Sequence, residues 1–250
     1  MLAIVLVGCG RWCAMTTERP AIQQALQAIR AGPMCLPCLR VLPVTGVAVS
    51  TLSGPIHTDT VCATDDTAFG LEELQFDLGE GPGWEAFASR RPVSVPDLWL
   101  PEQPRWPLFA EAVRKTRARA FFAYPLSVGA TAVGVMDLYR STPGPLDGPT
   151  EHDARVLAGL VAAELLNRVL SAEDVDLMGG ANAGRPSPWR DHPQDRRAIH
   201  QATGMLMAQL DLPVGAAYAR LRGHAFASGM TVADVAAAMV ARTLMLNGDS

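Results

Sequence analysis

The stretch from residue 179 to residue 191 places the strongest limit on how this chain can fold. It has no hydrophobic periodicity, is rich in residues that end helices and strands, and reads Gly-Gly-Ala-Asn-Ala-Gly-Arg-Pro-Ser-Pro-Trp-Arg-Asp. Such a composition is typical of a linker. Periodic patterns lie on both sides of it, and 250 residues are enough for two small domains. The sequence therefore predicts a first domain at 15–172, a linker at 173–192 and a second domain at 193–250.

The first domain alternates helical and β-rich segments. Pro20 is a good first helical residue, and Gly32-Pro33 ends the helix that follows it. Further helices are expected at 66–78 and at 107–113, and another is expected directly after the glycine-rich turn 79–83. Strands are expected at 44–52, 57–63, 92–95, 118–126 and 132–139. A long amphipathic helix over 150–172 completes the domain, with Thr150 and Asp153 as its capping box. This order predicts an α+β fold in which helices flank an antiparallel sheet.

The second domain contains three short amphipathic helices, expected to begin near Pro193, Pro213 and Thr231. Four apolar residues of the first helix share one arc, with Thr203 at its edge: Ile199, Ala202, Leu206 and Leu210. Each helix is too short to be stable alone in water. Their apolar faces are therefore expected to pack into an all-α three-helix bundle.

The polar side of the first of these helices carries Arg197, His200, Gln201 and Gly204. A glycine in the middle of a helix costs about 1 kcal/mol relative to alanine, so Gly204 calls for a reason. Close packing of a neighbouring helix is one explanation, and approach of a phosphate or a base edge to the backbone is another. The residues alone favour a solvated face over nucleic-acid contact and leave both open.

Bulk composition limits the partners and the compartment. A formal charge of −4 argues against nucleic-acid binding through overall charge. Five cysteines form no disulfide framework, and Cys35-x-x-Cys38 is half of a zinc site, so reduced thiols in a cytoplasmic protein are expected. The apolar start of the chain is far too short to cross a membrane, and residues 1–14 are interpreted as a non-native or disordered extension before a natural start at Met15.

Catalytic and cofactor motifs are not apparent, so we expect no enzyme, no metal site and no cofactor. The five histidines are scattered: His57, His152, His192, His200 and His224. The turn at 79–83 resembles a phosphate-binding loop only in its glycines, because no Lys-Ser/Thr follows and Pro82 removes a backbone amide. It is interpreted as a structural turn or one wall of a ligand pocket.

Several motifs of the first domain resemble GAF domains of actinobacterial regulators. They are Leu78-Gly79-Glu80-Gly81-Pro82, the step from Pro92 to Asp97, Trp106-Pro107, Tyr124-Pro125-Leu126 and the segment 134–138. The resemblance implies a sensor domain with a small-molecule pocket between sheet and helices, for which Trp84, Phe121 and Tyr124 are the candidate lining residues. The cyclic-nucleotide signature is missing, and glycine stands at position 83, where relatives often carry cysteine.

The second domain is similar to ANTAR domains over residues 193–246. The similarity lies in Ala202-Thr203-Gly204-Met205-Leu206-Met207, in Ala217-Tyr218-x-x-Leu221-Arg222-x-x-Ala225 and in Val232-x-Asp234-Val235-Ala236. It implies a bundle that binds RNA stem-loops in transcription antitermination. The expected RNA-binding residues are Arg196, Arg197, Gln201, Thr203, Gly204, Tyr218 and Arg222. Many members carry lysine where Thr203 stands, so one phosphate contact is expected to be lost here.

Together these features predict a cytoplasmic, signal-responsive regulator that binds paired RNA hairpins and promotes transcription antitermination. Two RNA loops would be met by two bundles, so a homodimer is expected, formed through the helix at 151–172. The sensed signal is expected to be a small molecule or a protein partner. The alternative is a sensor and protein-interaction module that binds no RNA.

Overall fold

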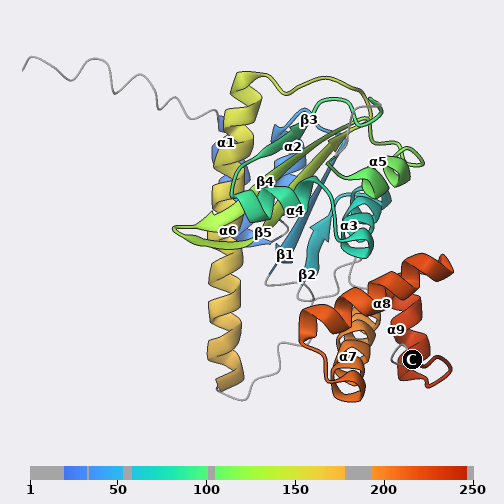
Figure 1. Cartoon of the computed structure of the whole chain (residues 1–250). Coiled ribbons are helices and arrows are strands. Elements are labelled where there is room, and N and C mark those ends of the chain that lie inside the picture. The colour runs from blue at the N-terminus through green and yellow to red at the C-terminus, as the bar shows by residue number, and fades with distance from the viewer. Residues whose placement is uncertain (1–19, 33, 53–57, 101–104, 178–192, 247–250) are drawn as a thin grey trace, which may run out of the picture.

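The computed structural model describes residues 20–32, 34–52, 58–100, 105–177 and 193–246. Within these ranges the first domain is a five-stranded antiparallel sheet with helices on both faces, in the strand order β2-β1-β5-β4-β3 (Figure 1). The strands are β1 (Gly46–Leu52), β2 (Thr58–Ala63), β3 (Val93–Val95), β4 (Ala120–Val128) and β5 (Thr131–Arg140). The predicted antiparallel sheet flanked by helices is confirmed. The predicted extension at 1–14, Met15 and most of the linker lie outside the described residues.

Strand β4 shows how the two faces of the sheet bury different cores, because successive side chains of a strand point to opposite faces. Phe122 and Tyr124 pack with the helices α1 (Pro20–Ala31), α2 (Cys35–Val41) and α6 (Gly148–Leu177). Phe121 and Ala123 pack with the helices α3 (Asp66–Leu78), α4 (Pro82–Ser89) and α5 (Pro107–Val113). The sheet therefore separates two apolar layers.

Helix α3 has a defined cap at each end. The side chain of Asp65 accepts a hydrogen bond from the backbone N–H of Ala68 at 2.8 Å, which begins the helix. Gly79 ends it in the left-handed conformation (φ 60°), and its N–H donates to the carbonyls of Gln75 and Phe76. The orientation of α3 matters below because its C-terminal end faces the second domain.

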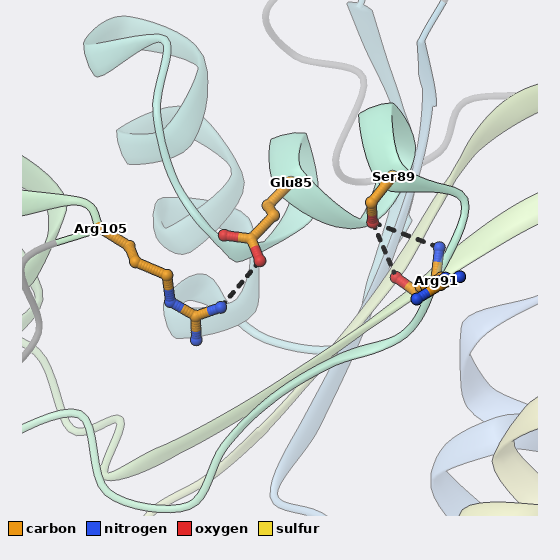
Figure 2. Close-up of polar contacts among 4 residues, drawn as sticks. All are labelled: Glu85, Ser89, Arg91 and Arg105. Carbon is orange, nitrogen blue, oxygen red and sulfur yellow. Dashed lines mark hydrogen bonds and ion pairs between the residues drawn. The ribbon is translucent and has the colours of Figure 1, made fainter.

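Two acidic side chains, Glu80 just before α4 and Glu85 within α4, connect this part of the chain to α5. Glu80 accepts from the backbone N–H groups of Leu108 and Phe109 at 2.7 and 2.9 Å, and so satisfies the exposed amides at the start of α5. Glu85 on α4 pairs with Arg105, just before α5, at 2.8 Å (Figure 2). Both contacts hold α4 and α5 in a fixed relation over one face of the sheet.

Helix α2 is a feature that the sequence pattern did not predict. Its seven residues include Pro37 and give no usable hydrophobic period. The helix brings Cys35 beside Cys62 of β2, and the two cysteines form a disulfide with a Cα–Cα distance of 6.0 Å. The expectation of reduced thiols is therefore wrong for this pair. Cys38 is a buried free thiol whose S–H donates to the carbonyl of Met34, and burial raises its pKa to about 12.

Helix α6 begins earlier than the capping box predicted. It starts at Gly148, and the backbone N–H of Thr150 donates to the side chain of Asp147 at 2.8 Å. Because of this hydrogen bond, Asp147 is the cap. Pro149 is compatible with this start, since proline fits the first turn of a helix. The helix continues through residue 177, past the predicted end at 172.

The second domain consists of α7 (Pro193–Leu210), α8 (Val214–Ser228) and α9 (Val232–Val240) (Figure 1). Thr231 caps α9 by accepting from the N–H of Asp234 at 3.0 Å, which agrees with the predicted start of this helix near Thr231. Gly229 ends α8 with φ 66°. Of the four apolar residues predicted to share one arc of α7, Ile199, Ala202 and Leu206 are buried and Leu210 is half-buried. Val235, Met239 and Leu246 are buried with them, whereas Val214 at the start of α8 is exposed. Among the described helices, none combines the length and apolarity that spanning a membrane requires.

Candidate functional site

A small pocket lies in the first domain between the sheet and helices α3 and α4. Its empty volume is about 290 Å³, part of it open to solvent. The lining residues come from β1, β5, α3 and α4, and they are Ser50, Leu52, Glu72, Gln75, Phe76, Gly83, Trp84 and Val135. The pocket is therefore where the resemblance placed a sensor site, between sheet and helices.

A buried polar network forms the inner wall of this pocket. Ser50 donates to the carboxylate of Glu72. The side-chain amide of Gln75 donates from Nε2 to Oδ2 of Asp137 at 2.7 Å and accepts at Oε1 from the backbone N–H of Gly83 at 2.7 Å. Gln75 thus connects the sheet to the start of α4.

Asp137 of β5 and Glu72 of α3 place two carboxyl groups in contact inside the domain. Asp137 is 2% exposed and Glu72 is 7% exposed. Burial first, and then the charge of Glu72, raises the pKa of Asp137 well above its ordinary value. We therefore expect this carboxyl pair to retain a proton at pH values where exposed carboxyl groups are ionised.

Gly83 is required by the same network. A Cβ atom at this position would lie 2.7 Å from Oδ2 of Asp137 and 2.9 Å from Oε1 of Gln75. The space that a cysteine side chain needs is therefore filled here by polar atoms. Sequence reasoning missed Glu72, Gln75 and Asp137, although two polar residues on the inner side of α3 and an aspartate within an apolar strand were visible signals.

The three residues predicted to line the pocket lie in three different environments. Trp84 lines the pocket, and its indole N–H donates to the carbonyl of Gln75 at 2.8 Å. Phe121 is fully buried and packs edge-on against Phe109, with ring centroids 6.0 Å apart. Tyr124 is buried on the opposite face of the sheet, where desolvation raises its pKa to about 12. The structure thus brings only Trp84 of the three into the lining of this pocket.

In the bundle, three of the predicted RNA-binding residues form an exposed strip along α7. Arg197, Gln201 and Gly204 are exposed, and their spacing places them on one side of the helix. A Cβ atom on Gly204 would meet no atom within 4 Å outside its own helix, so helix packing does not require this glycine. Arg196 belongs to α7, but its side chain lies outside the described residues.

Thr203 lies on the inner side of α7. It is 1% exposed, and its hydroxyl donates to the carbonyl of Ile199 at 2.7 Å. The position at which this chain departs from the ANTAR pattern is therefore filled by a small side chain that bonds back to its own helix.

Tyr218 and Arg222 of α8 face the first domain. Tyr218 is 4% exposed, and its ring packs on Phe76 of α3 with centroids 5.8 Å apart. The guanidinium group of Arg222 lies over Gly79, at the end of α3. Arg197, Gln201 and Gly204 are therefore exposed on α7, whereas Tyr218 and the half-buried Arg222 contact the first domain.

Charge and metal-binding chemistry complete the description of the site. Residues 193–246 contain five arginines and three aspartates, so the bundle is slightly positive in a chain whose formal charge is −4. The part of the chain that the structure describes has no cluster of three or more His, Cys, Asp or Glu side chains suited to a metal ion.

Comparison with known proteins matches both parts of the chain. The GAF domain model matches residues 19–166 and the ANTAR domain model matches residues 190–240. A GAF domain from a phosphoenolpyruvate-protein phosphotransferase of Coxiella burnetii is 17% identical, covering 61% of this chain and 95% of its own, with a TM-score of 0.48. The corresponding Acinetobacter domain is 11% identical, covering 59% and 92%, with a TM-score of 0.47. A comparison with curated proteins gives no match.

Proposed function

Because this chain belongs to the GAF domain family and carries an ANTAR domain after it, we propose that it is a signal-responsive regulator that binds paired RNA hairpins and promotes transcription antitermination. The GAF domain senses the signal, a small molecule or a protein partner, at the pocket beside Trp84. The bundle binds RNA. Two copies of the chain act together in the cytoplasm, one bundle to each hairpin.

The observation that carries this proposal is the exposed strip of α7. Arg197 supplies a cation that can bind a phosphate or stack on an unpaired base, and Gln201 supplies an amide for base edges. Gly204 leaves the backbone open to close approach at the same surface, with no packing reason for its presence. A glycine at this position costs about 1 kcal/mol of helix stability relative to alanine, and close approach of RNA to the backbone offers a reason for it.

The experiment that tests the proposal is crosslinking of RNA to the intact protein in cells, followed by sequencing of the bound RNA. We expect paired hairpins upstream of terminators. Purified protein should then bind the recovered two-hairpin RNA with a salt-dependent affinity, and should not bind a scrambled RNA of the same length.

A matched pair of variants tests the assigned surface. Arg197→Ala should weaken binding about tenfold or more, because a charge-assisted hydrogen bond contributes about 1.5–3 kcal/mol. Arg40→Ala removes the same charge from an exposed position on α2 of the first domain and should leave binding unchanged. Equal behaviour of the two variants would remove α7 from the RNA interface. Failure of the intact protein to bind any hairpin RNA would favour the interaction module without RNA.

A further inference from the structure

Phe76 belongs to the helix α3 of the GAF domain, yet its side chain is buried in the core of the ANTAR bundle. It packs in one apolar cluster with residues of α7, α8 and α9. Its ring contacts Tyr218 with centroids 5.8 Å apart and planes inclined by 45°, and the Tyr218 hydroxyl donates to the Phe76 carbonyl at 3.4 Å. Phe76 and Tyr218 are each 4% exposed. The two domains therefore share a small apolar contact.

Arg222, one turn after Tyr218, makes the second part of this contact. A Cβ atom on Gly79 would lie 1.5 Å from its Nη1 atom, so the guanidinium group occupies the space where any other residue would have a side chain. Gly79 is the C-terminal cap of α3. The last carbonyl groups of a helix carry a partial negative charge, which favours a cation at this place. Gly79 thus adopts a left-handed conformation that favours glycine, and its missing side chain leaves the space that the Arg222 guanidinium group occupies.

We infer that the C-terminal end of α3 is a docking surface for α8, and that docking covers the RNA-binding residues Tyr218 and Arg222. This inference rests on the proposed function, because those two residues are assigned to RNA by the ANTAR resemblance. In the docked form Arg197 and Gln201 on α7 stay exposed. On α8, Tyr218 is buried and Arg222 is half-buried against the end of α3. The structure is therefore a closed form in which two of the assigned RNA-binding residues, Tyr218 and Arg222, contact the sensor domain.

The sensor pocket adjoins this docking surface. Phe76 lines the pocket and also packs on Tyr218, and the neighbouring Gln75 ties α3 to Asp137 and Gly83. A ligand that rearranges this end of α3 changes the contact with α8 directly. Small contacts between domains open readily, so a modest difference in ligand affinity between the docked and undocked forms shifts the equilibrium.

Two variants of intact protein test the docking, with one matched control. Phe76→Ala removes the apolar side chain that enters the bundle. Gly79→Asn keeps a residue that tolerates the left-handed conformation and displaces the guanidinium group of Arg222, without truncating the core. Phe69→Ala is the control, because it removes the same side chain from the same helix at a half-buried position that packs against the core of the GAF domain.

Two measurements are made on each protein. The first is the dissociation constant for a synthetic two-hairpin RNA carrying the loop sequences recovered by crosslinking. The second is hydrogen exchange of the α8 backbone amides without RNA. We expect Phe76→Ala and Gly79→Asn to bind RNA about tenfold more tightly and to exchange faster in α8, because apparent affinity rises with the fraction of the competent form. Phe69→Ala should match the wild type in both.

Three other results would contradict the docking or the proposed function. If the wild type binds RNA and the two docking variants bind it no more tightly, the inference is wrong and the proposed function stands. Unchanged exchange in α8 likewise overturns the docking. If neither the wild type nor any variant binds hairpin RNA, the proposed function fails, and the masking of RNA-binding residues fails with it.

Discussion

Gly204 and Thr203 stand next to each other on α7 and have opposite environments. Gly204 is exposed with open space around it, so Gly204→Ala should raise the free energy of unfolding by about 1 kcal/mol. The same variant should weaken RNA binding, because the new methyl group blocks approach to the backbone. Urea unfolding and RNA titration on the same protein measure the two effects.

Gly223 provides the control for this prediction. It lies in the middle of α8 and is exposed, and a Cβ atom there would also meet no atom within 4 Å, so Gly223→Ala should stabilise the bundle similarly. Its RNA affinity should stay at the wild-type value. If both variants bind RNA normally, Gly204 has no role in close approach of the RNA.

The buried carboxyl group of Asp137 should make the free energy of unfolding depend on pH. Its pKa is raised in the folded protein, so the stability it contributes is present at low pH and is lost as pH rises through the folded pKa. The change is at most about 1.4 kcal/mol per pH unit for one proton. Asp137→Asn cannot ionise, and its amide can donate to Glu72 while its oxygen accepts from Gln75.

We therefore expect Asp137→Asn to gain stability relative to the wild type in urea unfolding as pH rises above the ordinary pKa of an aspartate, until the folded-state group itself ionises. Asp97→Asn should show the opposite trend, and only in the acidic range at and below the ordinary aspartate pKa, where the unfolded chain takes up the proton. The backbone N–H of Trp99, and then Arg119, lower the pKa of Asp97, so the wild-type residue contributes more as pH rises. A pH-independent difference between Asp137→Asn and the wild type would contradict this account of the carboxyl pair.

At the scale of elements, the sequence predicted most helices and strands because their apolar residues repeat with a clear period. Helix α3 spans Asp66–Leu78, as predicted, between the caps Asp65 and Gly79. Helix α2 was missed because seven residues with a proline cannot show a helical period. The pocket lining was largely missed for another reason: Gln75 and Asp137 are far apart in sequence, and only the packing of α3 on β5 brings them together.

The disulfide between α2 and β2 leads to a prediction about these elements. It closes a loop between cysteines separated by 27 positions, and constraining such a loop in the unfolded chain contributes about 3–4 kcal/mol. Reduction should therefore lower the urea midpoint for unfolding of the first domain. The Cys35→Ala, Cys62→Ala double variant should unfold at this lower midpoint whether or not reductant is present. If the urea midpoint of the wild type were the same with and without reductant, the disulfide would not stabilise the domain.

At the scale of the whole molecule, the relation between the two domains was not predictable from periodicity. Phe76 is an apolar residue on the pattern of α3, and Tyr218 is an apolar residue on the pattern of α8, so periodicity assigns each to the core of its own domain. Their contact joins residues 142 positions apart. Only the folded arrangement shows that a residue lining the sensor pocket also enters the bundle.

The proposed pairing of two chains on two hairpins predicts a specific stoichiometry. Sedimentation of the saturated complex should give two chains of 26.6 kDa for each two-hairpin RNA. When the second loop is replaced by an unrelated loop of equal length, the apparent affinity should fall by about 10² or more, because binding of the second bundle is then no longer intramolecular. A one-to-one complex whose affinity is unaffected by the second loop would rule out paired recognition. Because two bundles must reach two loops at once, lengthening the RNA between the hairpins should reproduce the same loss gradually.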